Sequence, residues 1–168
     1  MCALEACAED CAEVAEDSGE YIDSGSGELE REANVKAPEL ILFASDIDWK
    51  LFDANLAYRV LSLPAMMAKA KANIAFSFDQ LSSPPDWEAG FEARIIEYSL
   101  IGLECIRLSN LIQLKYNLSR SVNDNKSTVE RLTRARDKIK AIRQEAQEIN
   151  AARGQREFAS LSNQTQSK

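Results

Sequence analysis

The chain contains no histidine, and this absence excludes much catalytic chemistry. Without an imidazole there can be no Ser-His-Asp triad and no Cys-His pair, and no metal site can use histidine ligands. The sequence also lacks the glycine-rich patterns that hold phosphates, namely GxxxxGK followed by Ser or Thr and GxGxxG at a strand–helix junction. We therefore identify no catalytic residues, expect no cofactor and predict a protein that is not an enzyme.

Glycine and proline are also scarce, at six and four among 168 residues. An all-β fold with many tight turns needs more of both. Hydrophobic residues make up 45% and charged residues 28% of the chain, which is an ordinary composition for a globular protein. This length is typical of one domain with tails. Together these figures favour a helical domain.

The sequence contains no segment with the character of a membrane span or a secretory signal. The most hydrophobic window, residues 95–114, is long enough to cross a bilayer but contains Glu97, Glu104 and Arg107. Each charge is costly at the centre of a membrane, so we interpret this window as a buried helix. Acidic residues interrupt residues 1–17, and no basic residues precede them. We therefore expect a cytoplasmic protein, in which cysteines stay reduced.

Charge is distributed unevenly along the chain. Residues 1–50 contain 14 acids and three bases, whereas the remaining residues contain 13 acids and 17 bases. Residues 1–38 also include a Ser/Gly-rich stretch that is typical of a flexible linker. We interpret residues 1–38 as an acidic, flexible, disordered arm, in which residues 3–16 have the composition of a short helix. A helical domain is expected to follow at residues 39–154.

The first part of this domain contains short segments. Residues 40–44 are an apolar run that is either a strand or a buried lead-in to a helix, which periodicity does not decide. Ser45 and Asp48 form a weak capping box before a short helix. Asp53 is placed to cap a helix over residues 54–61.

Pro64 is expected to separate this helix from the next one. Proline is favoured in the first turn of a helix and disfavoured in the interior. We therefore predict a second helix over residues 64–81, in which apolar residues recur at spacings of three and four.

A long helix is predicted over residues 87–118, with Asp86 as its N-cap. Apolar residues fill most of its circumference, which is expected of a central helix that is contacted on several sides. Gly102 interrupts this helix at a cost of about 1 kcal/mol relative to alanine. We expect a neighbouring helix to approach closely at Gly102, and a bend in the helix is the alternative.

The narrow polar stripe of this helix contains two pairs of opposite charge. Arg94 stands three residues before Glu97, and Arg107 stands three residues after Glu104. Side chains three apart on a helix are neighbours, so we predict two surface ion pairs. A catalytic or metal-binding role for the two carboxylates is a minor alternative.

The last helix is predicted over residues 128–153, with Gly154 as its stop. Together with residues 87–118 it should form a long antiparallel hairpin, within a bundle of three to four helices. Residues 155–168 are expected to be a polar tail. The apolar residues of this helix form a heptad seam of about three repeats, which is short for a free coiled coil: Leu132, Ala135, Ile139, Ile142, Ala146 and Ile149.

Three cysteines, Cys2, Cys7 and Cys11, lie close together near the N-terminus. Thiolates bind soft metals, but a zinc site needs four ligands and the spacing C-x4-C-x3-C matches no common zinc pattern. Cys105 could supply the fourth ligand, although it is more simply a small core residue. Neighbouring acids should raise the pKa of these thiols and lower their reactivity. We favour no function for them and keep metal binding and redox exchange as alternatives.

A basic stretch, residues 126–143, contains seven bases and two acids. The bases wrap around the polar part of the helix, and no aromatic residue between Tyr116 and Phe158 is present to stack on a nucleobase. We interpret the stretch as solvated surface and keep nucleic-acid binding as an alternative. In a third interpretation, the acidic arm folds over this helix and screens it. The candidate interaction residues are Lys126, Arg131, Arg134, Arg136, Lys138, Lys140 and Arg143.

These patterns favour a non-enzymatic structural or interaction protein with a protein partner, which includes self-association. Residues 87–118 have more apolar surface than one hairpin partner can cover, so a second copy of the chain is a natural cover for the rest. A nucleic-acid-associated protein and a cysteine-based metal or redox protein are the alternatives. The sequence identifies neither the partner nor the biological process.

Overall fold

The computed structural model describes residues 3–23, 29–39, 48–118 and 125–165, with side chains described as far as Ala152. The chain divides into two units, residues 1–136 and 137–168. Ser45 and the apolar run at residues 40–44 lie outside the described residues, and so does Cys2. No helix in these described segments is long and apolar enough to cross a membrane.

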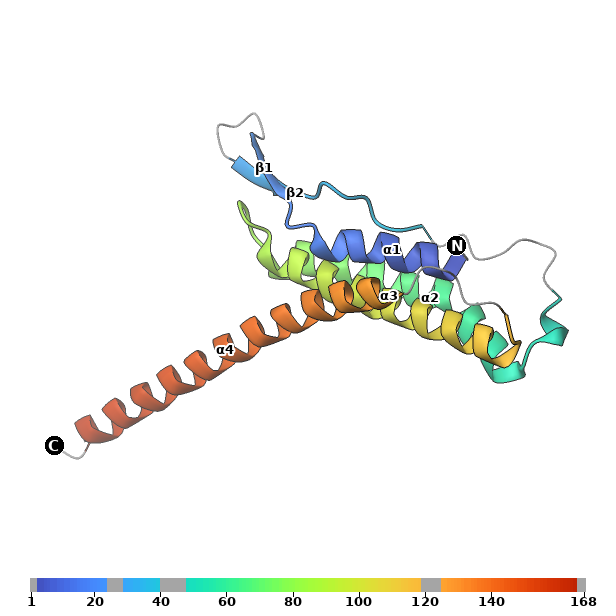
Figure 1. Cartoon of the computed structure of the whole chain (residues 1–168). Helices are drawn as coiled ribbons and strands as arrows, with labels where there is room; N and C mark the ends of the chain where they lie inside the picture. The colour runs from blue at the N-terminus through green and yellow to red at the C-terminus, as the bar shows by residue number, and fades with distance from the viewer. Residues whose placement is uncertain (1–2, 24–28, 40–47, 119–124, 166–168) are drawn as a thin grey trace. The chain divides into compact units, whose positions relative to one another are not determined.

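Helices dominate the described residues, which confirms the predicted all-α class (Figure 1). A small two-stranded antiparallel sheet, in which Tyr21 pairs with Arg31, is the exception. In chain order the elements are α1 (Ala3–Glu16), β1 (Glu20–Asp23), β2 (Leu29–Glu32), the 3-10 turn η1 (Trp49–Leu51), α2 (Ala54–Phe76), the π-helical turn η2 (Ser77–Leu81), α3 (Glu88–Lys115) and α4 (Lys126–Thr165).

The core is built around α3, which packs against α1 on one side and against α2 on another (Figure 1). Gly102 marks the closest approach to α3. A Cβ atom at this position would lie 2.8 Å from Leu132 Cδ1 on α4 and 2.9 Å from Cys11 Cβ on α1. The predicted close approach of a neighbouring helix at Gly102 is therefore confirmed.

Within residues 1–38, for which we predicted a flexible arm, the described segments 3–23 and 29–38 contain regular elements, and the short helix predicted there is α1. Small residues at helical spacing give α1 a narrow apolar face, and this face can approach α3 closely enough to be buried. The strands β1 and β2 continue the ordered structure, and Pro38 is buried. The buried apolar residues of α1 are Leu4, Cys7, Ala8, Cys11, Ala12, Val14 and Ala15.

The helix break predicted at Pro64 is also wrong, because α2 runs through it from Ala54 to Phe76. A proline inside a helix costs about 3 kcal/mol, and here the apolar residues buried on both sides of it outweigh that cost. Asp53 does cap α2 as predicted, since its Oδ1 accepts a hydrogen bond from the Leu56 amide at 3.0 Å. The buried residues of α2 are Leu56, Ala57, Val60, Leu63, Met67, Ala70 and Ile74.

The long helix α3 agrees with the prediction for residues 87–118, but its N-terminus differs. Trp87, with a left-handed φ of 50°, precedes the first turn and makes no side-chain cap. Asp86 does not cap the helix as expected. Its Oδ1 instead accepts a hydrogen bond from Tyr21 Oη at 2.5 Å, which connects the β1–β2 hairpin to the start of α3.

The helix α4 continues through Gly154 to Thr165, so the predicted stop at Gly154 is wrong and residues 155–165 of the predicted polar tail are helical. A single glycine costs about 1 kcal/mol in a helix, which is too little to end one when no proline follows. The predicted seam is buried at Leu132 and at Ile139, whereas Ile142 and Ile149 are 42% and 49% exposed. Near the start of α4, Leu132 belongs to the core and lies beside Gly102 of α3.

Candidate functional site

The basic helix contributes Arg131 to a contact between α4 and α1. Its guanidinium forms an ion pair with Glu9 through Nη1, and with Glu16 through Nε at 2.9 Å and Nη2 at 2.8 Å. Hydrogen bonds from the guanidinium to Glu16, and to Glu9 as well, raise the pKa of Arg131 against the effect of burial. The N-terminal acids therefore screen this base, as the third interpretation of the sequence predicts.

The other six predicted interaction residues are mostly exposed. Lys126, Arg134, Lys138 and Lys140 are exposed, as is Arg143. Arg136 is partly buried. Four of the seven bases belong to the first unit of the chain, and Lys138, Lys140 and Arg143 belong to the second.

Three thiols meet between α1 and α3, but they are not the three that the sequence grouped. Cys7, Cys11 and Cys105 are all buried and unoxidised. The Cys105 thiol donates a hydrogen bond to Cys7 Sγ at 3.8 Å. No group of three or more His, Cys, Asp or Glu side chains is arranged to hold a metal ion within the part of the chain that the structure describes. The sequence feature that could have predicted this cluster is the position of Cys105 on the central helix.

The thiols differ in acidity. Hydrogen bonds donated by Cys105 and then by Cys11 lower the pKa of Cys7, although burial acts in the opposite direction. The expectation that neighbouring acids raise the thiol pKa therefore fails at Cys7. The hydrogen bond to Cys7 and burial raise the pKa of Cys11. Of Cys7 and Cys11, Cys7 is consequently the thiol that more readily carries negative charge.

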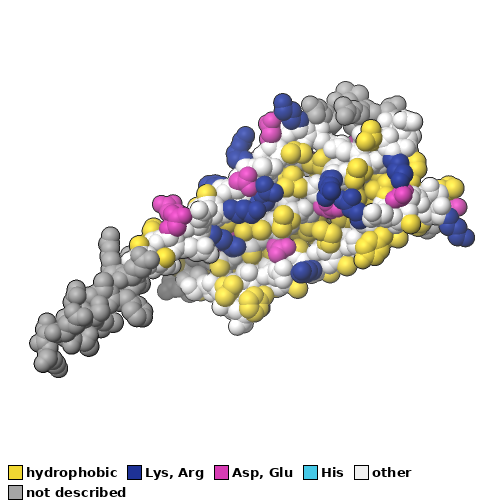
Figure 2. Space-filling view, turned by 90° about the horizontal axis from the view of Figure 1, so that it is seen from below, with side chains coloured by type: hydrophobic (Ala, Val, Ile, Leu, Met, Phe, Trp, Pro, Cys, Tyr) yellow, Lys and Arg dark blue, Asp and Glu magenta, His cyan; other side chains and the backbone are white. Residues whose placement is uncertain are grey.

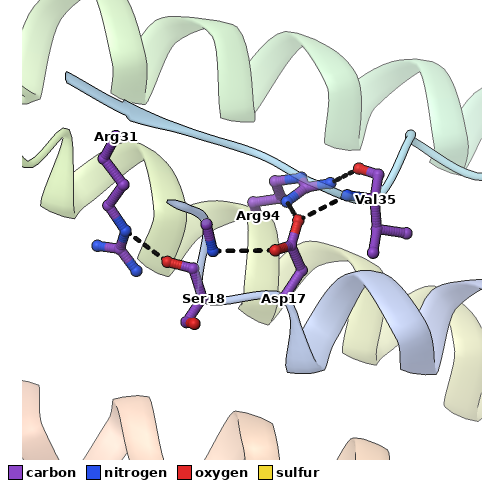
Figure 3. Close-up of polar contacts among 6 residues, drawn as sticks. Asp17, Ser18, Arg31, Val35 and Arg94 are labelled. Carbon is purple, nitrogen blue, oxygen red and sulfur yellow. Dashed lines mark hydrogen bonds and ion pairs between the residues drawn. The ribbon is translucent and has the colours of Figure 1, made fainter. Parts of the chain in front are cut away.

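A buried ion pair connects the end of α1 to α3 (Figure 3). Asp17 Oδ2 accepts hydrogen bonds from Arg94 Nη1 at 2.8 Å and from the Val35 amide at 3.0 Å, and Asp17 Oδ1 accepts one from the Gly19 amide at 2.9 Å. Arg94 also donates to the Val35 carbonyl. Burial raises the pKa of Asp17, but the hydrogen bonds from Arg94, Val35 and Gly19 outweigh this effect and lower it overall.

This arrangement corrects one of the two ion pairs predicted on α3. Arg94 points inward to Asp17 rather than along the helix to Glu97, and Glu97 accepts a hydrogen bond from Asn73 Nδ2 at 2.8 Å. The predicted pair of Arg107 with Glu104 is present at 3.8 Å. Because Arg94 holds Asp17 in the interior, we regard this centre as structural.

An apolar surface remains uncovered on α2 and α3. We call it the α2–α3 face. It consists of exposed or half-buried apolar residues on the side of α3 opposite to Cys105, together with Met66 of α2. Figure 2 shows the molecule from below, the side away from α1, where hydrophobic side chains form a broad patch with charged side chains set into it. The face consists of Met66, Ile96, Leu100, Leu103, Leu111 and Leu114.

Charged groups lie within and beside this face in pairs, and Arg107 stands on the leucine stripe itself, four residues from Leu103 and Leu111. Glu104 accepts a hydrogen bond from Arg59 Nη2 at 2.5 Å and also pairs with Arg107. At the far end, Lys115 Nζ lies 2.8 Å from Asp53 Oδ2. Between these pairs the surface is hollowed into an apolar pocket of about 420 Å³, whose lining includes Leu111 and Leu114. Protein interfaces commonly combine apolar surface with paired charges in this way.

No family model, curated protein or solved structure matches this chain.

Proposed function

We propose that this chain is a non-enzymatic helical interaction protein that associates with a second copy of itself through the α2–α3 face. The observation that carries this proposal is the row of leucines on α3 that remains exposed after α1, α2 and the start of α4 have packed. Leu100 is 45% exposed and Leu114 is 78% exposed. A row of this kind at helical spacing is suited to packing against another helix.

The charges around the face favour a second copy over a strongly charged partner. Three acids and three bases lie within or beside it, so the face is close to neutral although the whole chain has a net charge of −7. A two-fold dimer places the same surface on both sides of the interface, and a neutral surface avoids like-charge repulsion there. The six residues are Asp53, Arg59, Glu97, Glu104, Arg107 and Lys115.

The nucleic-acid alternative has less support. Arg131 is already paired with Glu9 and Glu16. The net negative charge of the chain would repel the phosphates that the remaining bases contact. Binding to nucleic acid that falls steeply between low and moderate salt, and that is weakened by Lys138→Gln and Lys140→Gln, would favour this alternative over the proposed function.

The test is the mass of the full chain in solution, measured by size-exclusion chromatography with light scattering at low and moderate salt. We expect a dimer whose mass does not depend on salt, because its interface is mainly apolar. Leu100→Glu should convert it to a monomer, because the dimer would then have to bury an unpaired charge. Leu61→Glu is the matched control, since Leu61 is 46% exposed and lies two positions from Arg59, on the opposite side of α2.

Two results would overturn the proposal. One is a wild-type chain that is monomeric at every accessible concentration. The other is a dimer that Leu100→Glu leaves intact, because the interface would then lie elsewhere. Circular dichroism of both variants should match the wild type, so that a change of mass reports association rather than unfolding.

A further inference from the structure

The contact between Cys7 and Cys105 joins two elements that are distant in the sequence. Cys7 lies on α1 and Cys105 on α3, 98 residues apart, and their sulfur atoms are 3.8 Å from one another. Both side chains are almost completely buried, at 3% and 0% exposure. The α1–α3 packing thus holds two thiols in direct contact in their reduced form.

The third thiol is less well placed to form a bond with Cys7. Cys11 lies four residues after Cys7 on the same helix, and residues at this spacing have Cβ atoms about 5–6 Å apart. A disulfide requires a Cβ–Cβ distance of about 3.5–4.5 Å. The regular geometry of α1 therefore opposes a bond between Cys7 and Cys11, whereas no such constraint applies between two helices. Cys105 is the favoured partner.

We propose that Cys7 and Cys105 are a redox pair, which a small two-electron oxidant such as hydrogen peroxide converts to a disulfide that fastens α1 to α3. The Cys7 thiolate attacks one oxygen of the peroxide, which gives a sulfenic acid and releases hydroxide. Cys105 sulfur then attacks the Cys7 sulfur, the S–O bond breaks, and the hydroxyl group leaves with the Cys105 proton as water. Overall two thiols and one peroxide give one disulfide and two waters.

Two properties of the cluster support this sequence of steps. Hydrogen bonds from the other two thiols lower the pKa of Cys7, and the thiolate is the form that reacts with peroxide. Hydrogen peroxide is close to water in size, so a local opening of α1 is enough to admit it. Cys11 has a raised pKa, which leaves it as the donor that stabilises the Cys7 thiolate.

The experiment uses the full chain, reduced and then treated in native buffer with increasing hydrogen peroxide. Peptide mapping by mass spectrometry under non-reducing conditions should find one cross-linked peptide containing Cys7 and Cys105, lighter than its parts by two hydrogen atoms. The same peptide should form in Cys2→Ala and Cys11→Ala and should be absent from Cys7→Ala and Cys105→Ala. The midpoint of thermal unfolding should rise on oxidation and return on reduction.

Three results would overturn the proposal. The first is four free thiols after oxidation of the native chain, under conditions that oxidise the denatured chain. The second is a disulfide that involves Cys2 or Cys11 in place of the expected pair. The third is Cys7 oxidised to a sulfinic acid with Cys105 still free. Each can be read from the wild-type chain, so the test stands even if an alanine variant fails to fold.

Discussion

Arg94 on α3 donates a hydrogen bond from Nη1 to Asp17 Oδ2 over 2.8 Å, and the two side chains are only 7% and 3% exposed. This pair joins the segment after α1 to the central helix. The two backbone amides of Gly19 and Val35 complete the coordination of the Asp17 carboxylate. The carboxylate therefore organises both the turn into β1 and the chain that follows β2.

Arg94→Met should destabilise the protein strongly. Removing one partner of a buried ion pair leaves the other charge uncompensated, which costs about 3–5 kcal/mol. Arg134→Met is the matched control, because Arg134 is exposed on α4 and its loss should cost less than about 0.5 kcal/mol. Urea unfolding followed by circular dichroism measures both changes. Equal effects of the two substitutions would show that the Asp17–Arg94 pair has no special role.

The same pair predicts a dependence of stability on pH. The pKa of Asp17 is lower in the folded chain than in the unfolded chain, where it is about 3.9. The stabilisation from the charged carboxylate is therefore complete at neutral pH, and it is lost as the pH falls below about 4 through the folded-state pKa. Asp17→Asn should be less stable than the wild type at neutral pH, and this difference should shrink in acid. A difference that grows in acid would contradict the assignment.

Arg131→Gln should lower the free energy of unfolding by about 1 kcal/mol, since the carboxylates of Glu9 and Glu16 are 38% and 45% exposed and solvent weakens such pairs. The loss should diminish as salt is added, because salt screens these charges in the wild type. Arg134→Gln, an exposed position on the same helix, should change stability by less than about 0.5 kcal/mol. A loss that is independent of salt would indicate packing of the side chain rather than charge.

Patterns that depend on neighbours along one helix were predictable from the sequence. The span of α3, the cap at Asp53, the pair of Glu104 with Arg107 and the close approach at Gly102 all belong to this class. Each follows from helical spacing or from the chemistry of one residue, so no knowledge of the tertiary fold was needed. The excess of apolar surface on α3 was predictable for the same reason.

Pairings between distant segments were not predictable. The acidic composition of residues 1–38 suggested a solvated arm, yet the small residues of α1 are buried and its acids pair with Arg131. Arg94 has a local acidic neighbour in Glu97, so nothing in the sequence pointed to Asp17, which is 77 residues away. The run through Pro64 depends on how much apolar surface α2 buries, and that quantity exists only in the packed structure.

The position of α1 also sets an order of events while the chain is being made. Cys7 and Cys105 are 98 residues apart, and Arg131 follows Glu9 by 122 residues. A ribosome adds about 5–20 residues per second, so several seconds pass between the synthesis of α1 and the synthesis of the residues that it contacts. During that interval the alanine- and cysteine-rich face of α1 lacks its native contacts on α3. The acidic side chains on the other side of α1 keep the helix hydrated. Although α1 is synthesised before α3 and α4, it consequently reaches its native place only after both have been made.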